Sequence, residues 1–364
     1  MSSCSADAKQ TGLFAINRDF GCTPIGWRRP DRMGFKSGRI ITTYELEITN
    51  GLRIHKNKFP VPSSQFQVTS SQFPIEPKIY VATIIKEELK DRYKMHFLKR
   101  IVEQKKREIL QKTSEVPLSD LKEKLKLTGL KRRSLLKKMQ NKPRFHFICE
   151  VKKASPSAGM IKKEVNPAQQ ARAYQAGGAS AISVLTDGAF FKGSAGDLKQ
   201  VRQAVQLPVL RKDFIIDAYQ IYESALMGAD LILLIVKILD AKEMDRLVKL
   251  ATDLQLEILI ELHEKDELAR LPQNPGQYPV ILGVNNRDLD TFEVNLNRSI
   301  DMRNDLPDEL PLISESGIKS ADDCLLLKAH GFQGALIGET LMRQVNPERF
   351  LREMVEVTNH VYAS

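Results

Sequence analysis

The chain has 364 residues, of which 42% are hydrophobic and 27% charged, so its composition is globular and excludes disordered, collagen-like and low-complexity proteins. No stretch approaches the roughly 18 uncharged apolar residues of a membrane span, and we expect no membrane association. Four scattered cysteines without CxxC spacing favour a reducing compartment, and six scattered histidines without HExxH or HxH pairs predict no metal site.

The net charge of +10 is distributed unevenly along the chain. Residues 1–142 contain 30 Lys and Arg against 14 Asp and Glu, whereas residues 143–364 contain 25 against 31. A basic patch that binds RNA is one interpretation of the first part. Solvated helix surfaces or a basic extension are the favoured interpretation, and we expect no nucleic-acid partner.

Residues 1–94 show no sustained periodicity and are predicted to be an extension with little core of its own, disordered or transit-like. Its arginines and serines resemble an organelle transit peptide, but such peptides tend to avoid acidic residues such as Asp7, Asp19 and Glu45. An assigned start upstream of the true one is a further interpretation, because Met95 opens a helical stretch. We expect a cytoplasmic protein, with a plastid location as the alternative.

Residues 95–142 have a helical pattern. Leu98, Ile101 and Ile109 recur near helical spacing among charged residues, Pro117 precedes a second helix, and a third basic piece covers Lys131–Gln140. These helices are predicted to lie against a larger body with their charged faces outward.

After Pro143 a unit recurs eight times, consisting of a short apolar run, a polar loop and an amphipathic helix. The predicted strands are Phe147–Val151, Ala181–Leu185, Val209–Arg211, Leu231–Val236, Ile258–Ile260, Val280–Val284, Pro311–Ile313 and Gly334–Ile337. The predicted helices are Pro167–Ala176, Asp197–Val205, Ala218–Met227, Ala241–Leu254, Lys265–Leu271, Leu296–Arg303, Ser320–His330 and Pro347–His360. Strands apolar on both faces, with no GxGxxG after the first, favour a closed barrel over an open Rossmann sheet. We therefore predict an α/β fold, a (β/α)8 TIM barrel over residues 95–364 that includes extra N-terminal helices in 95–142.

Polar residues follow five of the predicted strands, where the active site of such a barrel lies. They are Glu150 and Lys152 after the first strand, Lys212 after the third, Glu261 after the fifth, Asn285 and Arg287 after the sixth, and Glu315 after the seventh, and the apolar Phe214 and Leu289 lie in the same segments after the third and sixth strands. Alternation along the first, third and fifth strands places these side chains on the inward face. Fraying of a strand into a charged loop explains one such case, but it does not explain five.

Two glycine-containing loops predict an anion site. Ser316-Gly317 follows the seventh strand and Gly338-Glu339 follows the eighth, and the corresponding loops of TIM barrels often bind phosphate through backbone N–H groups. Ser155 in the first loop would add a hydroxyl. Ordinary turn chemistry is the alternative explanation for each glycine.

Lysine and glutamate in one barrel mouth indicate proton transfer. A lysine can donate a proton if partial desolvation and neighbouring cations lower its pKa from about 10.4. A glutamate can accept a proton, or donate one if burial raises its pKa. Lys212 and Glu261 are predicted to face each other across the mouth, although a Schiff-base aldolase would also use a barrel lysine.

Six strings occur in order, one at each expected strand end: Glu150–Ser157, Leu210–Phe214, Leu259–Glu261, Gly283–Leu289, Ile313–Gly317 and Ile337–Glu339. Together they resemble the indole-3-glycerol phosphate synthase family over about residues 95–362. Ala158 departs from the pattern, because many members have Lys before the glycine of the first loop. The resemblance implies ring closure of 1-(2-carboxyphenylamino)-1-deoxyribulose 5-phosphate, with loss of carbon dioxide and water, in tryptophan biosynthesis and without a cofactor.

The resemblance also implies roles for individual residues. Lys212 is expected to be the general acid of ring closure and Glu261 an acid or base of the dehydration. Glu150, Lys152, Asn285 and Arg287 are expected to hold or protonate the reacting groups, Phe214 and Leu289 to form apolar walls, and Glu315 to contact sugar hydroxyls. Ser155, Ser316, Gly317, Gly338 and Glu339 are expected to hold the phosphate. The implied partners are this small molecule and, through association, other tryptophan-pathway enzymes.

The residues alone are compatible with two other functions. One is a catalytically silent barrel whose basic front part binds nucleic acid or protein, which loss of Lys212, Glu261 or Glu150 would have favoured. The other is a different phosphate-binding barrel lyase, such as an aldolase that uses Lys212 as a Schiff base.

Overall fold

The computed structural model describes residues 97–129, 131–141, 144–162 and 164–360, together with the backbone of three short strands nearer the N-terminus. The chain divides into two units, Met1–Pro77 and Lys78–Ser364. In the first unit, β1 (Ile25–Gly26), β2 (Glu47–Ile48) and β3 (Leu52–Arg53) pair antiparallel in that order. Apart from these strands, the predicted extension of residues 1–94 lies outside the described residues, and its interpretations stay predictions.

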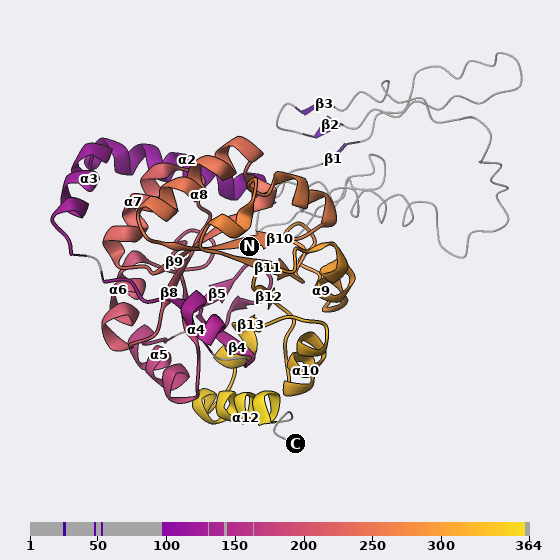
Figure 1. The fold of residues 1–364 in the computed structure, drawn as a ribbon. Coiled ribbons are helices and arrows are strands. Elements are labelled where there is room, and N and C mark those ends of the chain that lie inside the picture. Colours follow the sequence, from indigo (N-terminus) through magenta and orange to yellow (C-terminus); the bar gives the residue numbers. More distant parts are fainter. Residues whose placement is uncertain are drawn as a thin grey trace, which may run out of the picture. The chain divides into compact units, whose positions relative to one another are not determined.

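Eight parallel strands in the second unit close into a barrel, which confirms the predicted fold (Figure 1). They are β4 (His146–Val151), β7 (Ala181–Leu185), β8 (Val209–Lys212), β9 (Leu231–Ile235), β10 (Glu257–Leu262), β11 (Val280–Asn285), β12 (Leu312–Glu315) and β13 (Gly334–Ile337). Each strand pairs with the next in the chain, and β13 closes the ring by pairing with β4. All eight C-terminal ends therefore meet at one rim.

Side chains alternate between two cores along these strands, as a strand period of two requires. One core fills the barrel interior and includes Ile148, Leu210 and Leu259. The other lies between the strands and the outer helices and includes their chain neighbours Cys149 and Val209. The inward set fixes which residues point into the mouth where each strand ends.

Helices follow the strands and cover the outside of the barrel. They are α5 (Pro167–Ala176), α6 (Ala195–Ala204), α7 (Ala218–Met227), α8 (Ala241–Asp253), α9 (Asn297–Met302), α10 (Ala321–Ala329) and α12 (Pro347–His360). The fifth predicted α-helix is wrong in type, because Lys265–Arg270 is a 3-10 helix, η2. Its Glu267 turns inward, where its Oε2 accepts the backbone N–H of His263 at 2.7 Å.

Several short elements were not predicted. Strand β9 stops at Ile235 rather than Val236, where a 3-10 turn, η1 (Val236–Ile238), begins. A short helix, α11 (Glu339–Met342), follows β13, and the first loop contains a hairpin of β5 (Ala154–Ser155) and β6 (Gly159–Met160). Elements of two to four residues lack a periodic signal long enough to read from sequence. Among the described helices, none combines the length and the hydropathy that a bilayer crossing requires.

Three helices before the barrel pack against it with their apolar faces, as predicted. α2 (Phe97–Glu115) buries Leu98 and Ile101, and α3 (Leu118–Lys126) packs on α7. α4 (Leu135–Asn141) lies at the opposite rim, where Glu257 at the start of β10 accepts the backbone N–H of Leu135 at 2.8 Å. The helices thus contact both rims of the barrel.

Candidate active site

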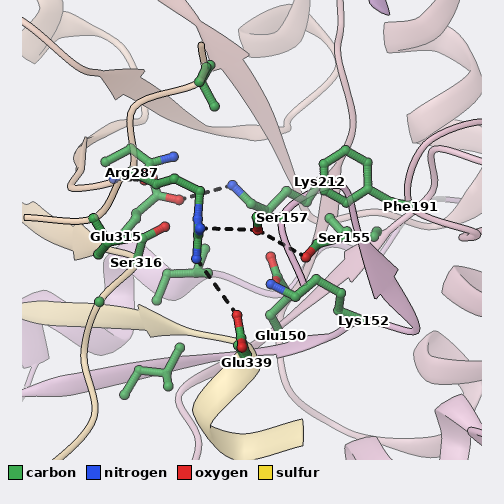
Figure 2. A pocket seen from close by; sticks show the side chains of 18 of the residues that line it. Glu150, Lys152, Ser155, Ser157, Phe191, Lys212, Arg287, Glu315, Ser316 and Glu339 are labelled. Atoms are coloured by element: carbon green, nitrogen blue, oxygen red, sulfur yellow. Dashed lines mark hydrogen bonds and ion pairs between the residues drawn. The ribbon is translucent and has the colours of Figure 1, made fainter. Parts of the chain in front are cut away.

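A cavity of about 730 Å³ opens where the barrel strands end (Figure 2). Every site residue predicted from the sequence lines it: Glu150, Lys152, Ser155, Lys212, Phe214, Glu261, Asn285, Arg287, Leu289, Glu315, Ser316, Gly317, Gly338 and Glu339. The strand ends therefore gather residues from positions up to 189 apart in the sequence, taking Glu150 and Glu339 as the extremes.

Lys212 lies between two buried carboxylates. Its Nζ is 3.0 Å from Glu261 Oε2 and 3.1 Å from Glu315 Oε2, and both glutamates are 1% exposed. Gly283 makes room for Glu315, because a Cβ there would lie 2.3 Å from Glu315 Oε1. Lys212 and Glu261 thus face each other at hydrogen-bond distance, which is the geometry that proton transfer requires.

The pKa of Lys212 shifts in the direction opposite to the one considered from the sequence. Burial would lower the pKa of this ammonium, but the carboxylates of Glu261, Glu315 and Glu150 hold the pKa well above its ordinary value. The condition considered from the sequence, a lysine pKa lowered by desolvation and neighbouring cations, is therefore not met in this site. Lys212 is fully protonated at neutral pH, which is the form a general acid needs.

The pKa values of the two carboxyl groups beside Lys212 shift in opposite directions. Burial would raise the pKa of Glu261, but Lys212, His263 and a hydrogen bond from Asn285 hold it below its ordinary value. Burial raises the pKa of Glu315, and repulsion from Glu261 adds to the rise. Carboxyl pairs whose environments push their pKa values apart can act separately as base and acid.

A second lysine–glutamate pair comes from the first strand. Lys152 Nζ lies 2.7 Å from Glu150 Oε1, and Glu150 is 3% exposed. Alternation along β4 points both side chains into the mouth, as the sequence predicted. Two of the lysines that line the cavity, Lys152 and Lys212, are therefore paired with carboxylates before any substrate binds.

Arg287 connects three loops across the cavity, as Figure 2 shows. Its Nη1 donates to Ser157 Oγ at 3.1 Å, and its Nη2 lies 3.8 Å from Glu339 Oε2. In the first loop, Ser155 Oγ accepts the N–H of Ala158 at 3.1 Å, so the residue that departs from the family pattern takes part in the turn. Arg287 thus holds the first and last loops near the sixth.

The loop after β12 has an unusual backbone. Ser316 has a φ of 66° and Gly317 a φ of 82°, so two successive residues lie in the left-handed region, which a side chain at Ser316 disfavours. Asn286, which sequence reasoning missed, supports this loop: its Nδ2 donates to the carbonyl of Ser316 and to Ser314 Oγ, both at 2.9 Å. Its position directly after Asn285 was the available signal.

The apolar lining is larger than the sequence predicted. Phe214 and Leu289 line the cavity, but so do Phe97 from α2 and Phe191 from the loop after β7. The ring centroids of Phe191 and Phe214 are 5.9 Å apart. Lys319, in the loop after β12, and Arg343, directly after α11, also line the cavity and were missed. Cations close after Gly317 and Gly338 were a signal for both.

His263 is a buried imidazole directly beyond β10, 1% exposed, with Nε2 3.3 Å from Glu261 Oε1. Burial lowers the pKa of His263 to about 4, although attraction to Glu261 opposes the shift. The folded protein therefore keeps this imidazole neutral at pH values where an exposed histidine is protonated.

We expect the free energy of unfolding to fall more steeply between pH 7 and pH 4.5 in the native chain than in His263→Gln. The unfolded imidazole gains its proton below pH 6.5, whereas the folded one gains it only near 4, so acid favours unfolding in this window. The difference should be about 2 kcal/mol at pH 4.5. Denaturant titrations of both proteins at the two pH values measure it, and parallel pH dependences would contradict the low pKa.

Comparisons with known proteins give a consistent result. A family model described as indole-3-glycerol phosphate synthase matches residues 98–354. A protein named indole-3-glycerol phosphate synthase from Lachnoclostridium phytofermentans is 44% identical over 216 residues, which are 59% of this chain and 79% of that protein.

Two solved structures are more distant. Tryptophan synthase subunit alpha from Legionella pneumophila has a TM-score of 0.46 and 14% identity, covering 62% of this chain and 97% of its own. Thiamine phosphate pyrophosphorylase from Pyrococcus furiosus has a TM-score of 0.43 and 14% identity, covering 61% of this chain and 98% of its own.

Proposed function

The chain belongs to the indole-3-glycerol phosphate synthase family, and from that premise we propose how its site residues carry out the family's reaction. The protein is a decarboxylating lyase of tryptophan biosynthesis. Its substrate, 1-(2-carboxyphenylamino)-1-deoxyribulose 5-phosphate, yields indole-3-glycerol phosphate, carbon dioxide and water. The single observation that carries the residue roles is the placement of Lys212 between Glu261 and Glu315 inside the cavity.

Lys212 acts as the general acid of ring closure. The aromatic carbon that bears the carboxylate attacks the ketone carbon of the sugar chain, a carbon–carbon bond forms, and the ketone electrons move to oxygen. The Nζ of Lys212 donates a proton to that oxygen as it becomes a hydroxyl. The ring carbon then loses carbon dioxide, and the electron pair of the broken bond restores the aromatic ring.

Glu261 and the first-strand pair complete the dehydration. The hydroxyl formed in the first stage leaves as water after protonation, and a base removes a proton to form the indole double bond. Glu261 has the lowered pKa and the position for this base, since it lies 3.0 Å from Lys212. Glu150 holds the amine or the leaving hydroxyl, and Lys152 pairs with the substrate carboxylate or serves as the second acid.

The other lining residues orient the substrate. Asn285 bonds Glu261 and is placed to hold the amine or a carboxyl group, while Arg287 braces the acidic residues and the carboxylate. Glu315, which lies 3.1 Å from Lys212 Nζ in the cavity, contacts the sugar hydroxyls. Phe214 and Leu289 form the walls that hold the aromatic ring over the ketone.

The two glycine loops bind the phosphate. One continuous cavity is lined by Ser155, Ser316, Gly317, Gly338 and Glu339. The left-handed backbone at Ser316 and Gly317 favours a turn that binds a ligand over an ordinary connecting turn, because strained backbone clusters at binding sites. The substrate carries one carboxylate and a phosphate, together about −2.5 to −3 at neutral pH. Lys152, Lys212 and Arg287 supply the opposing charge.

We expect Gly338→Ala to lower kcat/KM by at least about tenfold without unfolding the protein, since small displacements of reacting groups are costly. A Cβ at this position would lie 2.2 Å from Glu150 Oε1 and 3.1 Å from Lys152 Nζ, so the flexible end of Glu150 must move away. Steady-state kinetics and a melting curve measure the two effects. Gly196→Ala, where the nearest atom is 3.5 Å from the added Cβ, is the matched control and should keep its activity.

The reaction itself is tested by its products. Purified full-length protein incubated with the substrate should form the indole chromophore and release one carbon dioxide per indole. The aldolase alternative predicts instead a Lys212 adduct that borohydride traps with a keto substrate, and the silent-barrel alternative predicts neither product nor adduct. Trapping of such an adduct would replace the acid role of Lys212.

The cellular setting stays a prediction. We propose association with other enzymes of tryptophan biosynthesis, which supply the substrate and consume the product, and co-purification under mild conditions tests it. We also propose a cytoplasmic location, with the plastid as the alternative. Mass spectrometry of the mature N-terminus separates these, because cleavage close to Met95 would mark the preceding residues as removable.

A further inference from the structure

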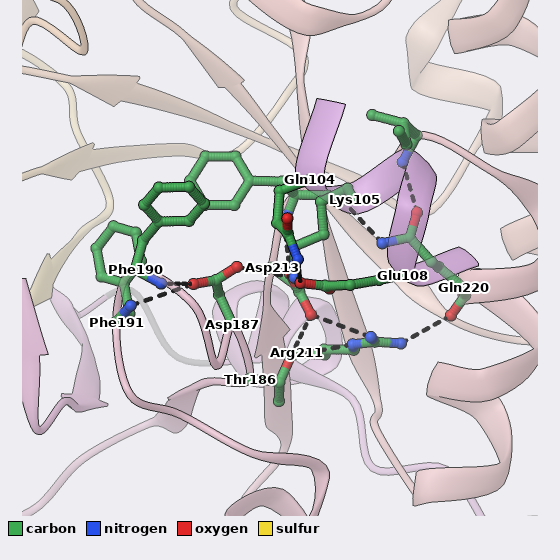
Figure 3. A network of polar contacts seen from close by, with 12 residues as sticks. Gln104, Lys105, Glu108, Thr186, Asp187, Phe190, Phe191, Arg211, Asp213 and Gln220 are labelled. Carbon is green, nitrogen blue, oxygen red and sulfur yellow. Dashed lines mark hydrogen bonds and ion pairs between the residues drawn. The ribbon is translucent and has the colours of Figure 1, made fainter. Parts of the chain in front are cut away.

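A buried cluster of charges lies beside the cavity and is centred on Lys105 of α2 (Figure 3). Lys105 is 3% exposed, although it belongs to a helix rich in solvated lysines. Its Nζ is 2.8 Å from Asp187 Oδ2 and 3.0 Å from Asp213 Oδ1. Glu108 of the same helix is a third partner, with Oε2 3.0 Å from the Lys105 Nζ, but its side chain is 28% exposed. A buried ammonium is costly unless it is paired, and the two aspartates are its buried partners.

Both aspartates belong to the rim of the active site. Asp213 follows Lys212 directly, and its Oδ1 also accepts the backbone N–H of Phe214 at 2.9 Å. Asp187 lies in the loop after β7, and its Oδ1 accepts the N–H groups of Phe190 and Phe191 at 2.7 and 3.1 Å. The two carboxylates thus fix the chain around the proposed acid and around one aromatic wall of the cavity.

The two aspartates differ in their other partners. Asp213 Oδ2 also pairs with Arg211 at 3.0 Å and accepts from Thr186 Oγ1 at 2.6 Å. Among the described residues, the cation that forms an ion pair with Asp187 is Lys105. Loss of the Lys105 charge would therefore leave Asp187 buried without a counter-ion and Asp213 with one cation instead of two. We therefore expect the loop after β7, which contains Asp187, to be displaced more than the tip of β8.

We propose that Lys105 is a positioning residue for this reaction: from outside the cavity, its charge neutralises Asp187 and Asp213 at the tips of β7 and β8, which keeps both carboxylates buried and keeps Phe191 and Lys212 pointing into the cavity. Lys105 does not line the cavity, so it acts through Asp187 and Asp213 and does not touch substrate. This inference rests on the proposed acid role of Lys212. Helix α2 thereby becomes part of the catalytic architecture as well as of the fold.

Lys105→Met tests the proposal, because it keeps the length of the side chain and removes its charge. We expect kcat/KM for indole formation to fall by about tenfold or more, the scale on which misplaced groups act. Lys105→Arg should recover most of the loss, and so should Lys105→Met combined with Asp187→Asn. The double variant removes the unpaired charge but keeps an oxygen for the N–H groups of Phe190 and Phe191.

Two controls separate positioning from stability. Lys106→Met removes an exposed cation from the same helix, paired with Glu103, and should keep its kinetics. Leu121→Ala truncates a buried leucine of α3 and should lower the melting temperature while kcat and KM stay unchanged well below it. The double variant also keeps the test informative if Lys105→Met fails to fold.

The possible outcomes are distinct. Unchanged kcat/KM in Lys105→Met, or a loss that neither Lys105→Arg nor the Asp187→Asn combination recovers, would overturn the positioning role. Failure of the wild-type chain to form the indole would instead overturn the proposed function. A reduced kcat/KM with recovery in both rescue variants supports the proposal.

Discussion

Lys212→Ala should lose about 10²–10⁴-fold in turnover while the barrel stays folded, since one positioned proton-transfer group typically supplies this factor, about 3–5 kcal/mol. Lys212 is the ammonium placed between Glu261 and Glu315, and the proposed ring closure depends on its proton. The substitution also leaves two buried carboxyls without their shared cation. One of them should then take up a proton, which limits the structural cost.

Single-turnover kinetics with saturating substrate measure this prediction, because they report the chemical step without product release. The matched control is Lys265→Ala, which removes another lysine–carboxylate pair, 2.7 Å from Asp305, outside the cavity. It should keep wild-type turnover. Near-normal turnover in Lys212→Ala, with circular dichroism unchanged, would remove the acid role.

Glu261→Gln should have a comparable effect, about 10²–10⁴-fold in turnover, because glutamine keeps the shape of the side chain but cannot accept the proton of the dehydration. The lowered pKa of Glu261 keeps it ionised at neutral pH, as a base requires. If dehydration becomes rate-limiting in this variant, the cyclised and decarboxylated intermediate should accumulate. Rapid quenching followed by mass spectrometry detects that species.

The control for Glu261→Gln lies on the same strand. Glu257 at the start of β10 is also buried, and it accepts N–H groups from Leu135 and Leu136 at the opposite rim. Glu257→Gln should lower stability but leave turnover unchanged. Equal losses of turnover in the two variants would show that either buried glutamate of this strand affects turnover equally. That result would contradict a specific catalytic role for Glu261.

Lys212 and Glu261 should not behave as independent residues. They are in direct contact, and the carboxylate of Glu261 is one of the groups that hold the pKa of Lys212 high. The double variant Lys212→Ala with Glu261→Gln should therefore lose less than the product of the single losses. Such non-additivity would identify the pair as one proton-transfer unit.

The sequence by itself determined the barrel and the set of residues at its mouth. Runs apolar on both faces, repeated eight times, allow few folds other than a closed parallel sheet. Period-two alternation then fixed which residues beyond each strand point inward, and all of the predicted residues line one cavity. This information is local, so a single chain contains it.

Pairing and charge state were decided only by the tertiary structure. Local alternation does not show that Lys212 is shared by Glu261 and Glu315, 49 and 103 residues away, nor that these carboxylates raise its pKa. Lys105 illustrates the same limit, although its helical spacing from Leu98 and Ile101 placed it on the buried stripe of α2. A charge on an apolar stripe signals a buried ion pair. Its partners, Asp187 and Asp213, are determined by which strand tips lie within 3 Å of the Lys105 ammonium, and electrostatic energies depend on such distances rather than on sequence separation.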